Sequence, residues 1–227
     1  MKETTITSFH ELHTARRSHW AEHFVYRGEK STKYKLRPKL GRRLAEPYKA
    51  KDGSIFPLPG HERVLFKNFK REAAPFLNNY PIDDWDWLAV AQHHGLATRL
   101  LDWTENILVA AYFACSRPAK GDAVIHVLNT RDIPIADLDV SPFLVKNDVI
   151  FHPRHSTPRI AAQSGLFTVH CDPAQEFETA LHERIIIPED FVAELTATLR
   201  SYGFSKSKLF PGLDSVAEGL NESVGCG

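Results

Sequence analysis

The chain has 227 residues, and its 28 Lys and Arg residues are balanced by 28 Asp and Glu residues. This balance disfavours a generally basic nucleic-acid binder and an acidic tail, but it allows a local basic patch. A chain of this length can bury a sizeable core without disulfide or metal staples. We therefore expect one globular domain over residues 1–227.

The cysteines and the apolar runs indicate a cytoplasmic protein. Cys115, Cys171 and Cys226 lie far apart and form no CxxC pair, which favours free thiols in a reducing compartment. No apolar run approaches the roughly 18 residues of a membrane span. The first residues are polar and lack the apolar stretch of a signal peptide. We expect no membrane partner.

The first elements are a helix and a strand. Ser8 is a candidate N-cap with Glu11 three residues later, which predicts a helix over residues 8–19. Residues 23–28 are apolar and aromatic and end at a glycine, which predicts a strand. Seven basic residues then fall between Lys30 and Arg43, and this run is expected to be an extended loop.

Two helices and a central strand follow. Helical spacing of apolar residues predicts a helix over 61–77. A second helix is expected over 85–92, with Asp83 or Asp84 as its cap and Gly95 at its end. Residues 93–104 then read as a short strand or extended segment.

The second half of the chain is expected to add one buried helix, three strands and two more helices. The alanine-rich residues 105–114 predict a buried helix capped by Thr104. The patterns predict strands at 123–128, 166–170 and 184–187, and helices at 189–202 and 213–220. Regular alternation of strands and helices is absent, so the fold class is α+β.

Common catalytic signatures are missing from the sequence. It contains no GxxxxGK[ST] loop, no GxGxxG after a strand, no HExxH and no GxSxG. The close histidine pairs 10/13, 93/94 and 152/155 lack a supporting third ligand, so no metal is expected. The basic run beside Trp85 and Trp87 allows nucleic-acid binding, although Asp86 between the tryptophans opposes a phosphate backbone.

Polar residues concentrate inside an apolar stretch at Thr98, Arg99, Asp102 and Thr104. Buried polar groups are costly unless they are paired, so two interpretations stay open. In the first, Asp102 pairs with Arg99 or Arg27 and Thr104 only caps a helix. In the second, these residues line a cleft for a phosphorylated small molecule, with arginine on phosphate and Asp and Thr on ribose hydroxyls.

Several segments resemble the FRG domain, which takes its name from a Phe-Arg-Gly signature that reads Tyr-Arg-Gly in this chain. The resemblance covers about residues 20–222 and includes residues 26–28, 36–40, 92–104, 110–114, 159–160, 163–168, 185–188 and 209–211. The layout is similar to that of ADP-ribosyltransferases, in which strands carrying Arg, then Ser or Thr, then Glu follow one another. The resemblance thus implies a split mixed β-sheet core with N-terminal and flanking helices.

This resemblance implies an NAD-dependent enzyme that transfers ADP-ribose to a protein or nucleic-acid acceptor, in the manner of a bacterial toxin or phage-defence effector. It implies Arg27 on the phosphate or ribose, Gly28 at a close backbone approach, and Asp102 and Thr104 as positioning groups. The third catalytic position falls to Gln163, at the start of a late strand, or to Glu183, which is expected to face solvent. The residues expected to bind NAD are Tyr26, Arg27, Gly28, His94, Thr98, Arg99 and Trp103.

Two other functions remain open. The chain could be a nucleotide-binding module without catalysis, because a carboxylate at the third position is not assured. It could also be an interaction domain that binds RNA or DNA through residues 30–43.

Overall fold

A computed structural model describes residues 1–20, 23–43, 48–49, 51, 53–56, 58–77, 79–116, 120–154 and 162–223. Cys226 and residues 159–160 of the FRG resemblance lie outside these residues. Cys115 is a buried free thiol and Cys171 is an exposed one. No helix in the described part of the chain combines the length and the apolar character that crossing a membrane requires.

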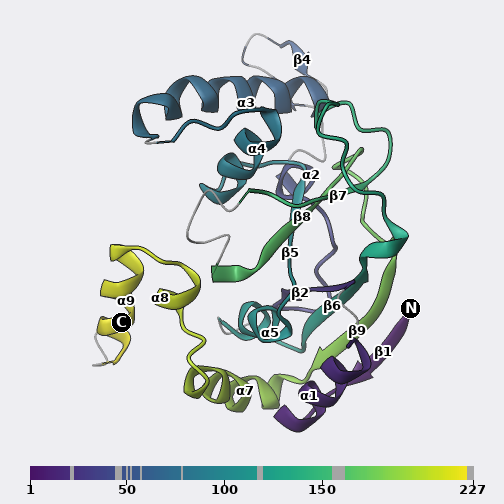
Figure 1. Ribbon diagram of the computed structural model, residues 1–227, viewed down its shortest axis with the longest axis vertical. Helices are drawn as coiled ribbons and strands as arrows, with labels where there is room; N and C mark the ends of the chain where they lie inside the picture. The colour runs from purple at the N-terminus through teal and green to yellow at the C-terminus, as the bar shows by residue number, and fades with distance from the viewer. Residues whose placement is uncertain are drawn as a thin grey trace.

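The centre of the fold is a mixed seven-stranded sheet in the order β1-β9-β6-β2-β5-β8-β7 (Figure 1). Only β1 and β9 are parallel, and all the other neighbours are antiparallel. The strands are β1 (Lys2–Thr5), β2 (Phe24–Glu29), β5 (Leu100–Thr104), β6 (Ala123–Asn129), β7 (Val149–Phe151), β8 (Gly165–Val169) and β9 (Leu181–Ile187).

The sheet is split between β2 and β5. These strands share the single register pair Tyr26↔Thr104, whereas β2 and β6 pair from Phe24 to Glu29 and β5 and β8 pair along the whole of β5. The strands β1, β9, β6 and β2 therefore form one half-sheet, and β5, β8 and β7 form the other. The predicted α+β class and the predicted mixed sheet are confirmed.

Helices cover each half-sheet separately. Helices α1 (Phe9–Ser18), α5 (Ile107–Cys115) and α7 (Glu189–Ser201) pack on the first half around Tyr26, which is fully buried. Helices α3 (Leu58–Ala73) and α4 (Asp84–His93) pack on the second half through Phe66, Trp85 and Trp87. Figure 1 shows these two groups of helices at opposite ends of the molecule.

The remaining elements are short or peripheral. Helix α2 (Lys39–Arg43) follows a loop, β3 (Tyr48–Lys49) and β4 (Ile55–Phe56) form a separate ribbon, and the 3₁₀ turns are η1 (Ala74–Phe76) and η2 (Thr130–Asp132). Helices α8 (Lys206–Leu209) and α9 (Leu213–Ser223) end the described chain.

Two predicted caps are confirmed and one is wrong. The side chain of Ser8 accepts a hydrogen bond from Glu11 N at α1, and the side chain of Asp83 accepts one from Asp86 N at α4. Helix α5, however, is capped by Asn106 and not by Thr104. Thr104 is still part of the last pair of the β5 ladder, and the chain needs two further residues to turn into the helix.

The loop expected over residues 30–43 is only partly correct, because its last residues form α2. Leu40 explains this helix, since it is fully buried and its N–H donates to Thr98 O. The edge strands β1 and β7 and helix α8 were not expected from the sequence.

Candidate functional site

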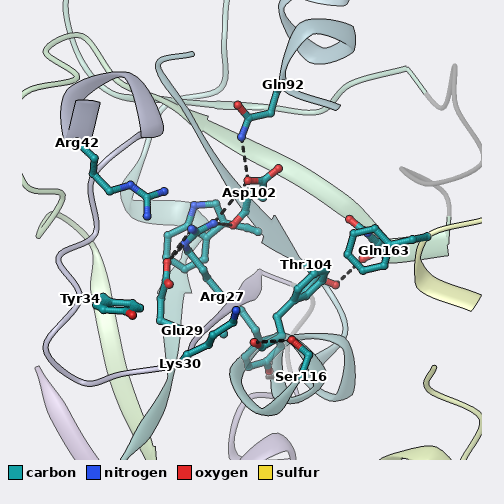
Figure 2. Close-up of a pocket in the computed structure, with 15 residues that line it drawn as sticks. Arg27, Glu29, Lys30, Tyr34, Arg42, Gln92, Asp102, Thr104, Ser116 and Gln163 are labelled. Atoms are coloured by element: carbon teal, nitrogen blue, oxygen red, sulfur yellow. Dashed lines mark hydrogen bonds and ion pairs between the residues drawn. The ribbon is translucent and has the colours of Figure 1, made fainter. Parts of the chain in front are cut away.

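A cleft of about 480 Å³ opens where the sheet splits (Figure 2). Beyond the pair Tyr26↔Thr104, no further register pair joins the antiparallel strands β2 and β5, so the residues after Tyr26 and those before Thr104 are free to line a cavity. The residues labelled in Figure 2 line it: Arg27, Glu29, Lys30, Tyr34, Arg42, Gln92, Asp102, Thr104, Ser116 and Gln163. Both half-sheets contribute to its walls.

Arg27 spans the split. Its Nη1 donates to the main-chain oxygen of Asp102 at 2.8 Å, and its Nε and Nη2 donate to Oε1 of Glu29 at 2.9 and 2.7 Å. The guanidinium thus connects the two half-sheets at a place where β2 and β5 share no further register pair. These bonds use three of the five N–H donors of an arginine, and the side chain keeps 13% exposure to the cleft.

The charges of this pair stabilise each other. Burial lowers the pKa of Arg27, but Glu29 and Asp102 outweigh burial and leave that pKa raised. Burial raises the pKa of Glu29, but Arg27, assisted by Arg42, leaves it lowered. Both groups are therefore ionised at neutral pH.

Two more cations face the cleft. Lys30 follows the end of β2, and Arg42 projects from α2 (Figure 2). Burial and the like charge of Arg27 lower the pKa of Arg42. Among the described residues, neither Lys30 nor Arg42 has a carboxylate within ion-pair distance. Three cations and only two carboxylates line the cleft, so it suits an anionic ligand.

Asp102 is held from the side of α4. Oδ2 of Asp102 accepts a hydrogen bond from Nε2 of Gln92 at 2.9 Å, and it lies 3.7 Å from Nη1 of Arg27. The side chain of Asp102 is 58% exposed, so the carboxylate reaches the cleft while one of its oxygens is fixed. Of the two pairings left open for Asp102, the structure shows the one with Arg27.

Thr104 and Gln163 meet at the opposite wall. Oγ1 of Thr104 donates to the main-chain oxygen of Gln163 at 2.6 Å and accepts from Asn106 N. Nε2 of Gln163 donates to Leu209 O at 2.8 Å, so its amide nitrogen is engaged by the segment of α8. Gln163 lies just before β8 and not at its first residue, since β8 begins at Gly165.

Glu183 lies outside the cleft, and the expectation that it faces solvent is wrong. Its side chain is 1% exposed, shares a hydrogen bond with Nε2 of His19 at 2.8 Å and forms an ion pair with Lys2 at 2.9 Å. Side chains alternate along β9, and Glu183 falls on the face that α1 covers. Burial raises its pKa, but hydrogen bonds from Thr4 and Lys2 and nearby charges leave that pKa lowered.

Arg99, expected at a phosphate, is buried away from the cleft. Its Nε donates to Glu62 at 2.9 Å, and its Nη1 donates to the main-chain oxygens of Pro142 and His170. The side chains of Arg99 and Glu62 are 4% and 3% exposed. This arginine joins α3 to the second half-sheet.

Two other predicted binding residues do not line the cleft. His94 is exposed at the end of α4 and lines a different depression. Thr98 is buried, and its hydroxyl donates to Oε1 of Gln92 at 2.6 Å. Thr98 therefore reaches the cleft only through Gln92.

Tyr26, Gly28 and Trp103 line the cleft but serve packing as well. The ring of Tyr26 is in the core, and burial raises its pKa to about 12. Trp103 is buried, and its Nε1 donates to Oγ1 of Thr168. A Cβ on Gly28 would lie 1.9 Å from Ala110 O, so its close backbone approach is to helix α5.

Glu29, Lys30, Arg42 and Gln92 line the cleft but are not among the individual site residues predicted from the sequence. Glu29 could have been found, because it stands two residues after Arg27 on a strand and so shares its face. Gln92 had only the signal of ending a helix before a polar run. Arg42 is separated from the strand by a loop, and no periodicity connects the two.

No cluster of three or more His, Cys, Asp or Glu residues that could hold a metal ion occurs in the described part of the chain. The described residues that line the cleft offer guanidinium, ammonium, carboxylate, amide and hydroxyl groups.

Comparison with known proteins identifies one family. Residues 22–123 match the model of the FRG domain, whereas no curated protein and no solved structure gives a significant match. The matched stretch holds every charged residue that lines the cleft, while Gln163 and Phe210 lie beyond it. Residues 22–123 of this chain are an FRG domain.

Proposed function

We propose that this chain is an NAD-dependent ADP-ribosyltransferase that modifies a protein or nucleic acid. One observation carries the proposal: Arg27 and Asp102 meet across the split of the sheet, in a cleft that has an excess of cationic groups. The volume of about 480 Å³ falls within the roughly 300–1,000 Å³ of small-molecule sites.

The charges of the cleft suit the two halves of the reaction. Arg27, Lys30 and Arg42 offer cations to the diphosphate, and arginine binds phosphate in a bidentate manner. Asp102 accepts hydrogen bonds from ribose hydroxyls and stabilises positive charge on the sugar. The bond between the ribose C1′ and nicotinamide breaks through an oxocarbenium-like state, as in glycoside cleavage. The acceptor then forms a bond to C1′ and releases its proton.

The order of the strands supports the same reaction. The strands that carry Arg27, Thr104 and the segment after Gln163 are neighbours in the order β2-β5-β8. Glu183 is assigned no part in catalysis, because it lies buried under α1. Gln163 remains the candidate for the third position, through the amide oxygen that its bond to Leu209 leaves open.

Incubation with NAD labelled in its ADP-ribose moiety tests the proposal. We expect release of nicotinamide together with a labelled acceptor in a cell extract. Arg27→Met should abolish both while the protein stays folded, and Lys146→Met, remote from the cleft, should leave both unchanged. A folded wild-type protein that never releases nicotinamide or labels an acceptor would overturn the proposal.

A nucleotide-binding module without turnover is the second candidate. It is favoured by the absence of a carboxylate at the third position, because Glu183 is elsewhere and Gln163 carries no charge. In that case NAD would bind in an Arg27-dependent manner, and nicotinamide release would stay at background in both the wild type and Gln163→Ala.

Nucleic-acid binding through residues 30–43 has less support. Lys35 forms an ion pair with Glu176, and Lys39 donates to Gly95 O, so these two cations are already engaged. Lys30 and Arg42 face the cleft. Nucleic-acid binding would be favoured if the affinity for RNA or DNA fell steeply with salt and fell further in Lys33→Ala.

A further inference from the structure

A chain of hydrogen bonds links the protein interior to the cleft. Thr98 is 1% exposed, in the loop between α4 and β5, and its hydroxyl contacts Gln92 at 2.6 Å. Gln92 is half-buried near the end of α4 and contacts Asp102 at 2.9 Å. Figure 2 shows the amide of Gln92 directed at the carboxylate of Asp102, above Arg27.

The directions of these bonds follow from their chemistry. Leu100 N donates to Oγ1 of Thr98 at 3.2 Å, so the single hydroxyl proton of Thr98 is available for Oε1 of Gln92. The amide oxygen of Gln92 must then face Thr98, and its NH₂ group must face Asp102. An amide in this orientation donates to a carboxylate and cannot turn over without losing two bonds.

The carboxylate of Asp102 is thereby held with one oxygen fixed. Oδ2 accepts a hydrogen bond from Nε2 of Gln92 and lies near Arg27, whereas Oδ1 has no partner among the described residues. The main-chain oxygen of the same residue accepts from Nη1 of Arg27. Asp102 thus presents one open acceptor atom to the cleft, at a set distance from the guanidinium.

We propose that Gln92, oriented by Thr98, is a positioning residue that aims Oδ1 of Asp102 at a ribose hydroxyl of the bound dinucleotide. This role rests on the proposed function, because it assigns the ribose of NAD to Asp102. We call the hydrogen-bonded residues Thr98, Gln92 and Asp102 the relay. Through the relay, the cleft distinguishes a ribose from a deoxyribose. Thr98, expected to touch the cofactor, acts here through Gln92.

A double-mutant cycle with ADP-ribose as the probe, measured by calorimetry, tests the relay. We expect Gln92→Leu to weaken ADP-ribose binding about tenfold, the scale of a hydrogen bond to a charged group. In an Asp102→Ala background the same substitution should change the affinity less than about twofold, because a residue that acts only through Asp102 has nothing left to aim. A merely structural glutamine would instead weaken binding equally in both backgrounds.

Further variants separate positioning from folding. Thr98→Ser keeps the hydroxyl and should bind ADP-ribose as the wild type does, whereas Thr98→Val should resemble Gln92→Leu. Gln175 is exposed and does not line the cleft, so Gln175→Leu is the matched control and should have no effect. Wild type should bind ADP-ribose more tightly than its deoxyribose analogue, and Gln92→Leu should lose this preference while its melting temperature stays close to that of the wild type.

Each result decides between the two proposals. ADP-ribose binding that is unchanged in Gln92→Leu, or an effect that persists in the Asp102→Ala background, overturns the relay and leaves the transferase in place. A relay that behaves as described in a protein that never releases nicotinamide overturns only the transferase. If ADP-ribose does not bind to the wild type, the relay is wrong, and nicotinamide release alone then decides on the transferase.

Discussion

Arg27 and Arg99 are both paired with a glutamate, yet they belong to different kinds of region. Arg99 lies in the buried contact between α3 and the second half-sheet, which we call the joint. There Glu62 and two main-chain oxygens surround its guanidinium. Arg27 lies at the split of the sheet, where Glu29 and Asp102 hold one side and the cleft borders the other.

The difference shows that a buried ion pair does not by itself mark a site. The 4% exposure of Arg99 leaves no path for a ligand, whereas the 13% exposure of Arg27 is enough to present unused N–H donors to a cavity. The joint stabilises the fold, and the cleft holds charge where a ligand can reach it. Substitutions should therefore separate stability from binding.

The largest effect is expected at the joint. Arg99→Met leaves Glu62 buried without a partner, which should cost about 3–5 kcal/mol of unfolding free energy. The matched Arg27→Met leaves Glu29 beside a water-accessible cleft and should cost only about 1 kcal/mol. Urea denaturation measures both. Equal losses in the two variants would remove the distinction between joint and cleft.

His126 provides the next effect, since it stands beside Arg27 on β6 and neither ring nitrogen has a partner among the described residues. Burial, together with Arg27 and Arg184, lowers its pKa to about 4. The unfolded chain takes up a proton below its ordinary pKa of about 6.5, whereas the folded state does not until about pH 4. The contribution of neutral His126 to the free energy of unfolding is fully present above pH 6.5. The free energy of unfolding should fall by about 3 kcal/mol as the pH falls from 6.5 towards 4.

His126→Leu should remove this pH dependence. The variant should be at least as stable as the wild type at pH 7, because an unpaired polar ring is replaced by an apolar side chain. The difference in unfolding free energy between variant and wild type should grow as the pH falls from 6.5 to 4. Parallel stability curves over this range would show that His126 is not held neutral.

A somewhat smaller effect is expected at the back of the cleft. Gly28→Ala would place a Cβ 1.9 Å from Ala110 O, so β2 and α5 must separate at a cost of about 2–3 kcal/mol. Gly60→Ala, where the added Cβ meets open space, is the matched control and should change stability little. Thermal unfolding distinguishes them, and equal melting temperatures would contradict the close packing behind the cleft.

Local signals predicted much of the fold. Ser8 and Asp83 bond the backbone of their own helices, so a cap followed by an apolar period located α1 and α4. The predicted strands 23–28, 123–128 and 184–187 match β2, β6 and the second half of β9, because apolar residues dominate these segments, whereas the first half of β9 was not predicted. The polar strand β1 was missed, because its pairing with β9 joins residues about 180 positions apart and leaves no local trace.

Candidate site residues were predicted where they lie together in one segment of the sequence. They were missed where only the tertiary fold brings them together. Arg27, Asp102 and Thr104 stand in segments whose sequence suggested chemistry. Arg99 stands in the same kind of polar run, but the position of Glu62 on α3 decides that it is structural. Glu183 was placed in solvent because its partner His19 follows a helix far away in the chain.

The most direct test of the account is a crystal structure of the protein with ADP-ribose. We predict density for the diphosphate against Arg27 and Arg42, with a ribose hydroxyl within hydrogen-bond distance of Oδ1 of Asp102. A ligand bound in any other depression, with Arg27 still paired to Glu29 and the cleft filled only by solvent, would contradict the central claim that the split of the sheet forms the nucleotide site.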